Sequence, residues 1–425
     1  MDRRILKRAV VKVVLIGVLI GATAAVLAAS SREPKRRRNS KPVQKLSAGG
    51  SVRIQNPSGP ITVDGWDQDT VQATVEGSEG EGQVSVQEES SGIVSIRPNV
   101  QVRQRRGEVH LVIKIPRSAG IESLSTGRGA VQVTGVQGPV NVRTNSGELR
   151  IANVGPLSAS TSNGDIQVNS VSGTARLESQ SGSVEASDIS GRANIQTANG
   201  DVRAVRTGQL LIHSNSGGIT ADSVNGSATL ETNNGDVTVK DVTGDVIAKL
   251  QSGDFRGEDI GGLVNLTITS GEARATRIGG DLRVTAISSD IDVKCVKGSV
   301  ELASVSGSIT LNGIAGDASA VSTSGSVTFN GPIRPRGHYR LKSVSGEVSL
   351  RIPADSPGFT ATLASYSGEI QTDFPIKLDS PIQSGPINRR VVGRYGDGQS
   401  EITLDSFSGT ALLGKLSPGR APICK

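Results

Sequence analysis

Apolar and polar residues alternate along most of this chain, most regularly between about residues 129 and 325. One stretch runs Ile166, Val168 and Val171 and continues with Ala175 and Leu177, and most of the intervening residues are polar. A spacing of two is the period of a β-strand with one face turned inward. The 3.6-residue period of an amphipathic helix is absent from this stretch. The pattern therefore predicts short strands, each with one buried face.

Glycines divide the same region into units of 17 or 18 residues. The unit begins at a corner such as Asn163-Gly164-Asp165-Ile166, and a second, weaker glycine such as Gly173 lies midway. The corner recurs at Ser181-Gly182, Asn199-Gly200, Ser216-Gly217, Asn234-Gly235, Ser252-Gly253, Ser270-Gly271, Ser306-Gly307 and Ser324-Gly325. Glycine, Ser and Asn adopt the backbone angles of tight corners. A fixed repeat buries its apolar face only by stacking on its neighbours.

The predicted fold class is therefore all-β: a single-stranded, right-handed parallel β-helix (β-solenoid) with coils of about 18 residues. Roughly eleven regular coils, stacked ~4.8 Å apart, would make a rod of ~50 Å. Alanine and valine dominate the apolar positions, aromatic residues make up only 2% of the chain, and Phe255 is the only aromatic in the regular stretch. A thin core of small side chains is expected.

Two other solenoids use a similar repeat, and both fit less well. The left-handed hexapeptide helix needs an aliphatic residue every six positions, but the step from Val171 to Leu177 leads next to Ser183. The calcium-binding β-roll needs Gly-Gly-x-Gly-x-Asp in each half of the unit. Here the acidic residue directly follows a single corner glycine, and the second half lacks this motif.

Less regular segments flank the solenoid of residues 119–328 and are expected to cap it, because an open solenoid end is a template for strand pairing. Residues 47–118 are predicted to form an N-terminal cap with the first coils, with Trp66 packed over the end of the core. Residues 329–425 should form looser coils and a C-terminal cap. Aromatics return there and make it the favoured binding surface: Phe329, Tyr339, Phe359, Tyr366, Phe374, Tyr395 and Phe407.

The first 29 residues are expected to be an N-terminal membrane anchor or signal segment. Five basic residues precede an uncharged stretch from Val13 to Ala29, which is just long enough to span a bilayer and also fits a signal peptide. Because no clear Ala-x-Ala site precedes Ser30, an uncleaved anchor through residues 10–29 is favoured.

Residues 30–46 are predicted to form a basic linker, best explained as a solvated tether beside the membrane. Residues 1–45 carry twelve basic and two acidic side chains, so with a total formal charge of +6 the rest of the chain carries −4. A mildly acidic folded part argues against nucleic acid as a partner. The expected partners are the membrane and an unidentified protein or glycan ligand.

Acidic residues follow many corners and would form a row along one edge of the rod: Asp165, Asp201, Asp236, Asp254, Glu272 and Asp290. Calcium or a cationic partner could use such a row, but a solvated row that blocks lateral aggregation is favoured, because Ser183, Gly218, Ser308 and Ser326 interrupt it. The corner amides Asn163, Asn199 and Asn234 are expected to hydrogen-bond between coils, with a sugar-binding ladder as the alternative.

Other polar clusters give no convincing catalytic, cofactor or metal site. Asp64, Asp67 and Asp69 fit a turn, and Asp290 and Asp292 could hold a glycosidase-like pair only with a cleft that the sequence does not show. His110, His213 and His338 lack a neighbouring nucleophile motif. Cys295 and Cys424 could form a disulfide in an oxidising compartment, but their positions do not require one.

The chain resembles the bacterial putative-adhesin family, a β-helical domain of largely unassigned function. The resemblance covers residues 47–415. It rests on Gly59-Pro60-Ile61-Thr62-Val63-Asp64-Gly65-Trp66-Asp67, on the strand ending at Ile115-Pro116, on the serial Ser/Asn-Gly corners, and on a closing strand Glu401-Ile402-Thr403-Leu404 before Ser408-Gly409. It implies a β-helix behind an N-terminal signal or membrane segment, and it supplies no catalytic residues.

The expected function is that of a non-catalytic, adhesin-like protein of the cell envelope. It would be anchored in the membrane with the solenoid outside the cytoplasm, or secreted if the N-terminal segment is cleaved. The rod would serve adhesion, scaffolding or ligand sensing. The alternatives are a self-assembling β-helical scaffold and a β-helical polysaccharide lyase or hydrolase, which would need longer coils and a cleft lined with aromatic and charged residues.

Overall fold

The structure, a computed structural model, describes residues 43–47, 49–76, 83–90, 92–99, 109–378, 389–417 and 424. The predicted anchor (1–29) and most of the predicted basic linker (30–46) lie outside these residues. The described part of the chain consists of β-strands and their connections, without helices. It accordingly contains no helix of the length and apolarity that crossing a membrane requires.

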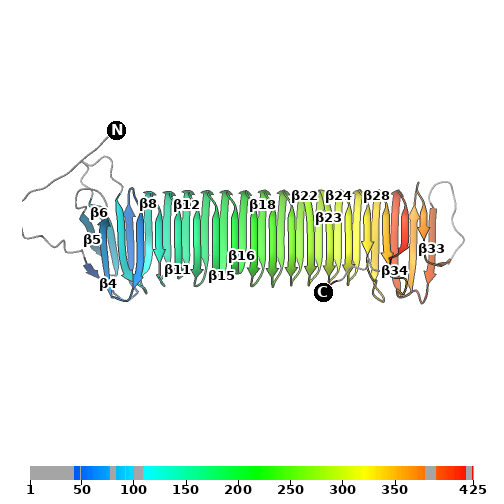
Figure 1. The fold of residues 1–425 in the computed structure, drawn as a ribbon, viewed down its shortest axis with the longest axis horizontal. Coiled ribbons are helices and arrows are strands. Elements are labelled where there is room, and N and C mark those ends of the chain that lie inside the picture. Colours follow the sequence, from blue (N-terminus) through cyan, green and yellow to red (C-terminus); the bar gives the residue numbers. More distant parts are fainter. Residues whose placement is uncertain are drawn as a thin grey trace, which may run out of the picture. The chain divides into compact units, whose positions relative to one another are not determined.

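Each repeat forms two strands that pack face to face, as the alternating pattern requires. In one repeat, β13 (Ile166–Val171) buries Ile166 and Val168, and β14 (Ala175–Ser181) buries Ala175 and Leu177. Each strand pairs in parallel with the equivalent strand of the next repeat, so Ile166 lies beside Val184 and Leu177 beside Ile195. The prediction of an all-β parallel solenoid is confirmed, with about 13 turns (Figure 1).

The strands form two faces. Face 1 contains β8 (Gly120–Arg128), β10 (Val140–Ser146), β12 (Leu157–Asn163), β14, β18 (Ala228–Asn234), β20 (Val246–Ser252), β24 (Val300–Ser306), β26 (Ala318–Ser324) and β28 (His338–Ser345). Face 2 contains β9 (Val131–Thr134), β11 (Leu149–Val154), β13, β17 (Ile219–Val224), β19 (Val237–Val242), β21 (Phe255–Ile260), β25 (Ile309–Ile314), β27 (Val327–Asn330) and β29 (Val348–Ile352). Four long strands contribute to both faces: β15 (Val184–Asn199), β16 (Val202–Ser216), β22 (Val264–Ile278) and β23 (Leu282–Val296).

The corner glycines are required by both backbone angle and space. Gly200 has a φ of 141°, and a Cβ at this position would lie 2.2 Å from the carbonyl oxygen of Gly182 in the preceding coil. The corners therefore stack glycine on glycine along the rod. Ser289 interrupts this column and lies buried within the continuous strand β23.

A third bend on face 2 was not predicted. Nine non-glycine residues there have positive φ at intervals of 17 or 18 residues: Asn153, Ser170, Asp188, Arg206, Ser223, Asp241, Asp259, Arg277 and Cys295. Such angles are uncommon outside glycine, and Asn and Asp tolerate them best. The sequence contains a signal for this bend, because the apolar spacing widens from two to three between Val168 and Val171.

At the N-terminal end the chain does not stack its coils in sequence order. The first coil, β2 (Ser51–Asn56) and β3 (Ile61–Trp66), lies between β8–β9 and an outer coil of β6 (Ile93–Asn99) and β7 (His110–Pro116). Antiparallel strands lie beyond it: β1 (Val43–Lys45), β4 (Thr70–Glu76) and β5 (Gln83–Ser90). Trp66 is half-buried beside the turn to β4, where its indole N–H donates to the Thr70 carbonyl at 2.7 Å. It is not among the side chains packed on the core, so its predicted place over the core end is wrong.

The C-terminal end shows the same rearrangement. The last coil in sequence, β34 (Ser400–Ser408) and β35 (Ala411–Lys415), lies between β28–β29 and an outer coil of β30 (Phe359–Ser365) and β31 (Ile370–Thr372). The antiparallel strand β33 (Arg389–Tyr395) pairs with β30 and with β32 (Lys377–Leu378). The strand Glu401–Leu404, expected to close the rod, is therefore last in sequence but internal in space.

Candidate binding surface

The acidic row is part of the framework of the rod. An Oδ1 atom of each of five Asp residues accepts a hydrogen bond from the backbone N–H of the equivalent position in the next coil, at 2.7–2.9 Å. These residues are Asp165, Asp201, Asp236, Asp254 and Asp290. The carboxylates thus satisfy corner N–H groups that the strand ladder leaves unpaired.

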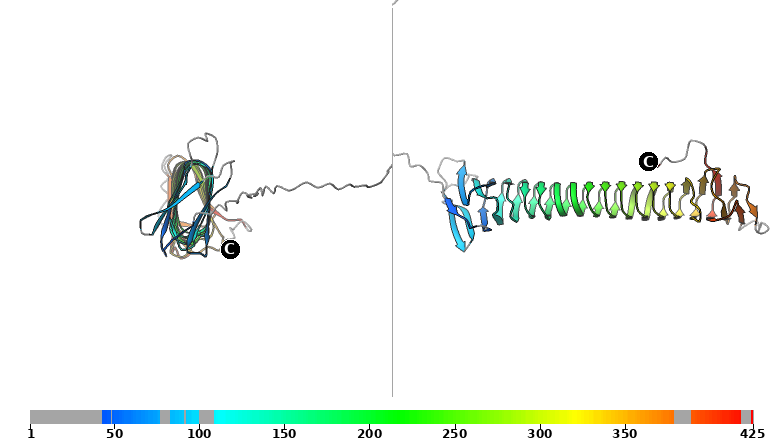
Figure 2. Two further views of the ribbon diagram at one scale, coloured as in Figure 1. Left: turned by 90° about the vertical axis from the view of Figure 1, so that its left-hand side faces the viewer. Right: turned by 90° about the horizontal axis from the view of Figure 1, so that it is seen from below.

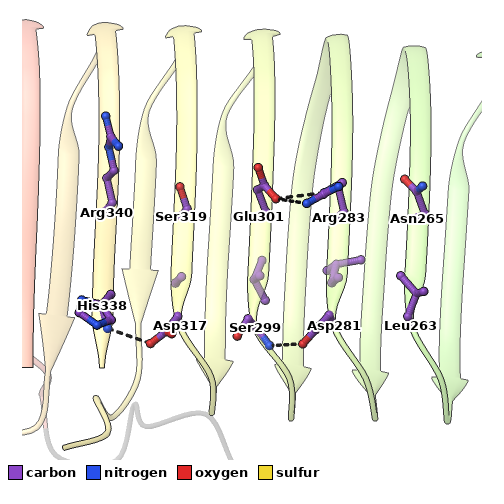
Figure 3. A pocket seen from close by; sticks show the side chains of 13 residues that line it. Leu263, Asn265, Asp281, Arg283, Ser299, Glu301, Asp317, Ser319, His338 and Arg340 are labelled. Atoms are coloured by element: carbon purple, nitrogen blue, oxygen red, sulfur yellow. Dashed lines mark hydrogen bonds and ion pairs between the residues drawn. The ribbon is translucent and has the colours of Figure 1, made fainter. Parts of the chain in front are cut away.

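At the other corner of the repeat, the one with the weaker midway glycine, Asp carboxylates also accept hydrogen bonds from backbone N–H groups of the next coil (Figure 3). Asp281 accepts from the Ser299 N–H at 2.7 Å, and Asp317 accepts from the His338 N–H at 2.8 Å. Partial burial pushes the pKa of Asp317 upward, but hydrogen bonds from Arg334 and from the His338 N–H outweigh it, so the pKa is lowered. The Asp317 carboxylate therefore stays ionised and ties the loop carrying Arg334 to the coil.

The remaining carboxylates considered for chemistry are engaged in separate contacts. Asp290 accepts from the backbone N–H of Ser308 at 2.7 Å, whereas Asp292 accepts from Lys294 at 2.8 Å. Asp67 pairs with Arg117 at 2.7 Å in the predicted turn. Among the residues that the structure describes, no group of three or more His, Cys, Asp or Glu side chains is arranged to hold a metal ion.

The three histidines occupy three different coils. His110 lies 3.0 Å from the Thr62 hydroxyl, His213 lies 3.2 Å from Glu231, and His338 lies 3.2 Å from Glu401. Each is a partner in a local polar contact between neighbouring strands.

The predicted corner amides do not form a continuous ladder, although Asn199 donates to the Gln180 carbonyl of the neighbouring coil at 3.5 Å. Asn163, Asn199 and Asn234 occupy alternate coils, and a serine coil lies between each pair. Inter-coil amide contacts occur one position earlier, where Asn233 donates to Asn215 at 2.8 Å, and on face 2, where Asn330 donates to Asn312 at 3.1 Å.

Most of the C-terminal aromatics fill the core and do not form a binding surface. Phe329, Tyr339, Phe359 and Phe374 are buried, and Tyr395 packs against Phe359 with ring centroids 5.1 Å apart. Only Tyr366 and Phe407 remain exposed, at 43% and 53%, and their rings stack with centroids 4.5 Å apart.

These two rings end a continuous row on face 1, which we call the apolar row. Strand pairing places six residues of adjacent coils side by side in the order Ile287, Val305, Thr323, Val344, Phe407 and Tyr366. All six are exposed, and Val305 has 51% of its surface accessible. Val321, two residues before Thr323, is exposed beside the row. Aligned exposed apolar residues of this kind mark interaction sites.

Along the N-terminal half of the rod, the same row is polar at every position except Ala198. Its earlier members are Asn145, Ser162, Gln180, Ala198, Asn215, Asn233, Gln251 and Thr269. The change was not predicted, although the sequence contains its signal: Ile287, Val305 and Val344 occupy positions where the inward–outward alternation calls for a polar residue. The apolar row is thus specific to the C-terminal part of face 1.

A shallow groove of about 730 Å³ lies on the same face (Figure 3). It is lined by outward side chains of successive coils, among them Arg283, Glu301, Ser319 and Arg340. Arg283 donates to Glu301 at 3.0 Å. The groove therefore borders the apolar row with a mixture of apolar and charged side chains, among them Leu263 and the Arg283–Glu301 pair.

The two cysteines of the chain form a disulfide that joins residues 129 positions apart. Cys295 occupies the last non-glycine position of the unpredicted bend on face 2, and Cys424 lies nine residues beyond the end of β35. The bond thus connects the C-terminal tail to the coil of β23. The sequence alone left the pairing of the two cysteines open, because no pattern in the sequence indicates where the C-terminal tail lies.

Comparison with known proteins identifies a family but no curated relative. The sequence matches the family described as Toastrack DUF4097 three times, over residues 47–223, 157–297 and 262–413. No curated protein matches it. The crystal structure of a putative cell adhesion protein from Clostridium sporogenes aligns with 8% identity over 89% of this chain and 99% of that chain, with a TM-score of 0.15. A likeness at that score carries no argument about fold or function.

Proposed function

This chain belongs to the Toastrack DUF4097 family, and on this premise we propose that it is a non-catalytic surface protein of the bacterial cell envelope. It presents a rigid β-helical rod for adhesion, scaffolding or ligand sensing. Its partner is a protein or glycan, and no nucleic acid is involved. The out-of-order coils and antiparallel strands at both ends act as caps that block end-to-end stacking.

The observation that carries this proposal is the apolar row. Monomeric proteins seldom keep an aligned run of apolar side chains in water without a partner. The strands on both sides of residue 287 pair in parallel and in the same register, so burial of the core does not explain why the outward residues change there. A binding role for the C-terminal half of face 1 explains the change.

The engagement of the carboxylates supports a non-catalytic role. A glycosidase needs two carboxyl groups that face each other across the scissile bond. Asp290 and Asp292, the only such pair that the sequence suggests, are instead hydrogen-bonded to the Ser308 backbone and to Lys294. Polysaccharide turnover that disappears in Asp290→Asn or Asp292→Asn would contradict this part of the proposal.

Two features support a location outside the cytoplasm. The apolar segment from Val13 to Ala29 has the length of a membrane span. The Cys295–Cys424 disulfide supports an oxidising compartment, because the cytoplasm keeps most thiols reduced. We propose that the segment anchors the protein, that the basic linker is a tether, and that the rod projects from the membrane.

Protease added to intact cells and to spheroplasts tests the location. We expect digestion of the rod without lysis and an N-terminal fragment that stays in the membrane. Digestion only after lysis would place the rod in the cytoplasm and refute the surface role.

Crosslinking in living cells tests the binding surface. A photo-activated amino acid at Val344 should capture a partner, whereas the same amino acid at Gln251, on the polar half of the row, should not. Both positions are exposed, so neither replacement disturbs the core. Equal capture at both positions, or capture at neither, would contradict a binding role for the apolar row.

A further inference from the structure

We propose that the occupant of the apolar row is a second copy of this chain, laid against the first in antiparallel orientation. This inference rests on the binding surface proposed above and names its partner. The two copies would lie side by side, a contact that the caps at the ends of the rod do not block.

The first support is the flatness of face 1. Viewed along the rod, successive coils superimpose on one another (Figure 2). Most sheets twist, but face 1 is stacked on face 2 across the core of the rod and stays flat. Since a second copy offers the same flat face, contact can continue along the whole apolar row, and two sheets packed in this way lie ~10 Å apart.

The second support is the size order of the side chains. The row begins with the aliphatic residues Ile287 and Val305 and ends with the aromatic rings of Phe407 and Tyr366. An antiparallel copy brings Phe407 opposite Val305 and Tyr366 opposite Ile287, so large residues face small ones. A parallel copy would put ring against ring at one end and leave a gap at the other.

The third support is charge. Most charged residues beside the row are paired within one chain, with Arg283 donating to Glu301 at 3.0 Å and Lys342 to Asp405 at 2.7 Å, and Arg340 adds one further positive charge. Identical surfaces can therefore approach without strong repulsion. A glycan would instead need a set of hydrogen-bonding groups, and the row offers only the hydroxyls of Thr323 and Tyr366.

The size of the contact predicts a weak association. Five steps of ~4.8 Å and a face seven residues wide define a patch of roughly 24 by 20 Å. Both copies together would bury about 1,000 Å², near the lower bound for a specific interface. Such a pair forms best where the chains are concentrated, as on one membrane surface.

The test uses the full-length chain in cells that produce two copies with different epitope tags. A photo-activated amino acid at Thr323 should give a crosslinked product that contains both tags. The change Val305→Lys in both copies should lower its yield about tenfold, since each introduced lysine then faces an apolar ring without a partner. Gln251→Lys in both copies is the matched control and should leave the yield unchanged.

A charge exchange tests the orientation. Val305→Lys in one copy and Phe407→Glu in the other should restore at least about half of the lost yield, because the antiparallel pair brings the introduced lysine opposite the introduced glutamate. Val305→Lys against Val305→Glu should restore nothing. Restoration only by the second combination would overturn the antiparallel arrangement.

The identity of the crosslinked product separates this inference from the proposed function. A product with both tags supports the second copy. A product with another molecule overturns this inference and leaves the binding role standing. No product at Thr323 overturns self-association, and the protease experiment still decides the location independently.

Discussion

The two halves of face 1 share one backbone and differ in what they present to solvent. Gln251 and Val305 lie three coils apart in the same row, on strands with the same pairing and the same corners. Inside the rod, apolar residues and stacked glycines repeat almost unchanged from one half to the other. The comparison shows that the inward residues determine the fold, whereas the binding that we propose depends on a few outward positions that the fold leaves free to vary.

A substitution in the column of stacked corner glycines, which both halves share, should have the largest effect on the stability of the rod. Gly217 has a φ of 120°, and a Cβ there would lie 2.3 Å from the Gly200 carbonyl oxygen. We expect Gly217→Ala to destabilise the rod by about 4 kcal/mol through backbone strain and displacement of the neighbouring coil. Chemical denaturation followed by circular dichroism measures this change.

The adjacent glycine provides the control. A Cβ on Gly218 would meet nothing closer than 3.6 Å, and its N–H, which donates to Asp201, is kept in alanine. Gly218→Ala should therefore change the free energy of unfolding by less than about 1 kcal/mol. Equal losses from the two substitutions would mean that the corner column does not determine coil stacking.

Removal of the disulfide should have the next largest effect on stability, and this effect should be confined to the C-terminal half of the rod. Replacing both Cys295 and Cys424 by serine removes a link across 129 residues. We expect a loss of about 3 kcal/mol for the coils that the link encloses. Hydrogen exchange should accelerate in β24 to β35 and stay unchanged in β10 to β14, and uniform acceleration would show that the rod unfolds as one unit.

These effects show which parts of the molecule could be predicted from the sequence. The parallel coils followed from the alternation and the corner glycines, because both depend on contacts between adjacent repeats. The insertion of β34 between β28 and β30 did not, since strands of equal period pair equally well in either order. The apolar row was visible in single positions such as Val305, but it becomes a surface only once the register is known.

Extending the apolar row should sharpen the contrast between the halves. Gln251 and Thr269 precede Ile287 in the row, so changing both to valine lengthens the row by two coils. We expect self-association to strengthen about tenfold, or by about 1.4 kcal/mol, with little change in the stability of the fold. Analytical ultracentrifugation of the full-length chain in detergent measures the dissociation constant, and an unchanged value would argue against pairing along the whole row.

The smallest expected effect is a pH dependence at the border of the apolar row. Hydrogen bonds from Arg334 and the His338 N–H lower the pKa of Asp317 in the folded chain despite the opposing effect of burial. The unfolded chain therefore binds this proton first as the pH falls. The contribution of Asp317 is fully present above its unfolded pKa of about 4, and it is lost as the pH drops through the lower, folded value.

Asp317→Asn should thus cost up to about 1 kcal/mol at pH 7, and the difference from the wild type should vanish towards pH 2. Asp281→Asn is the matched control, because Asp281 accepts a backbone N–H at the same corner and its amide replacement can still do so. We expect that variant to follow the wild type closely across the range. A pH-independent loss in Asp317→Asn would show that Asp317 acts through packing. Its pairing with Arg334 would then not explain how the loop that carries Arg334 is held against face 1.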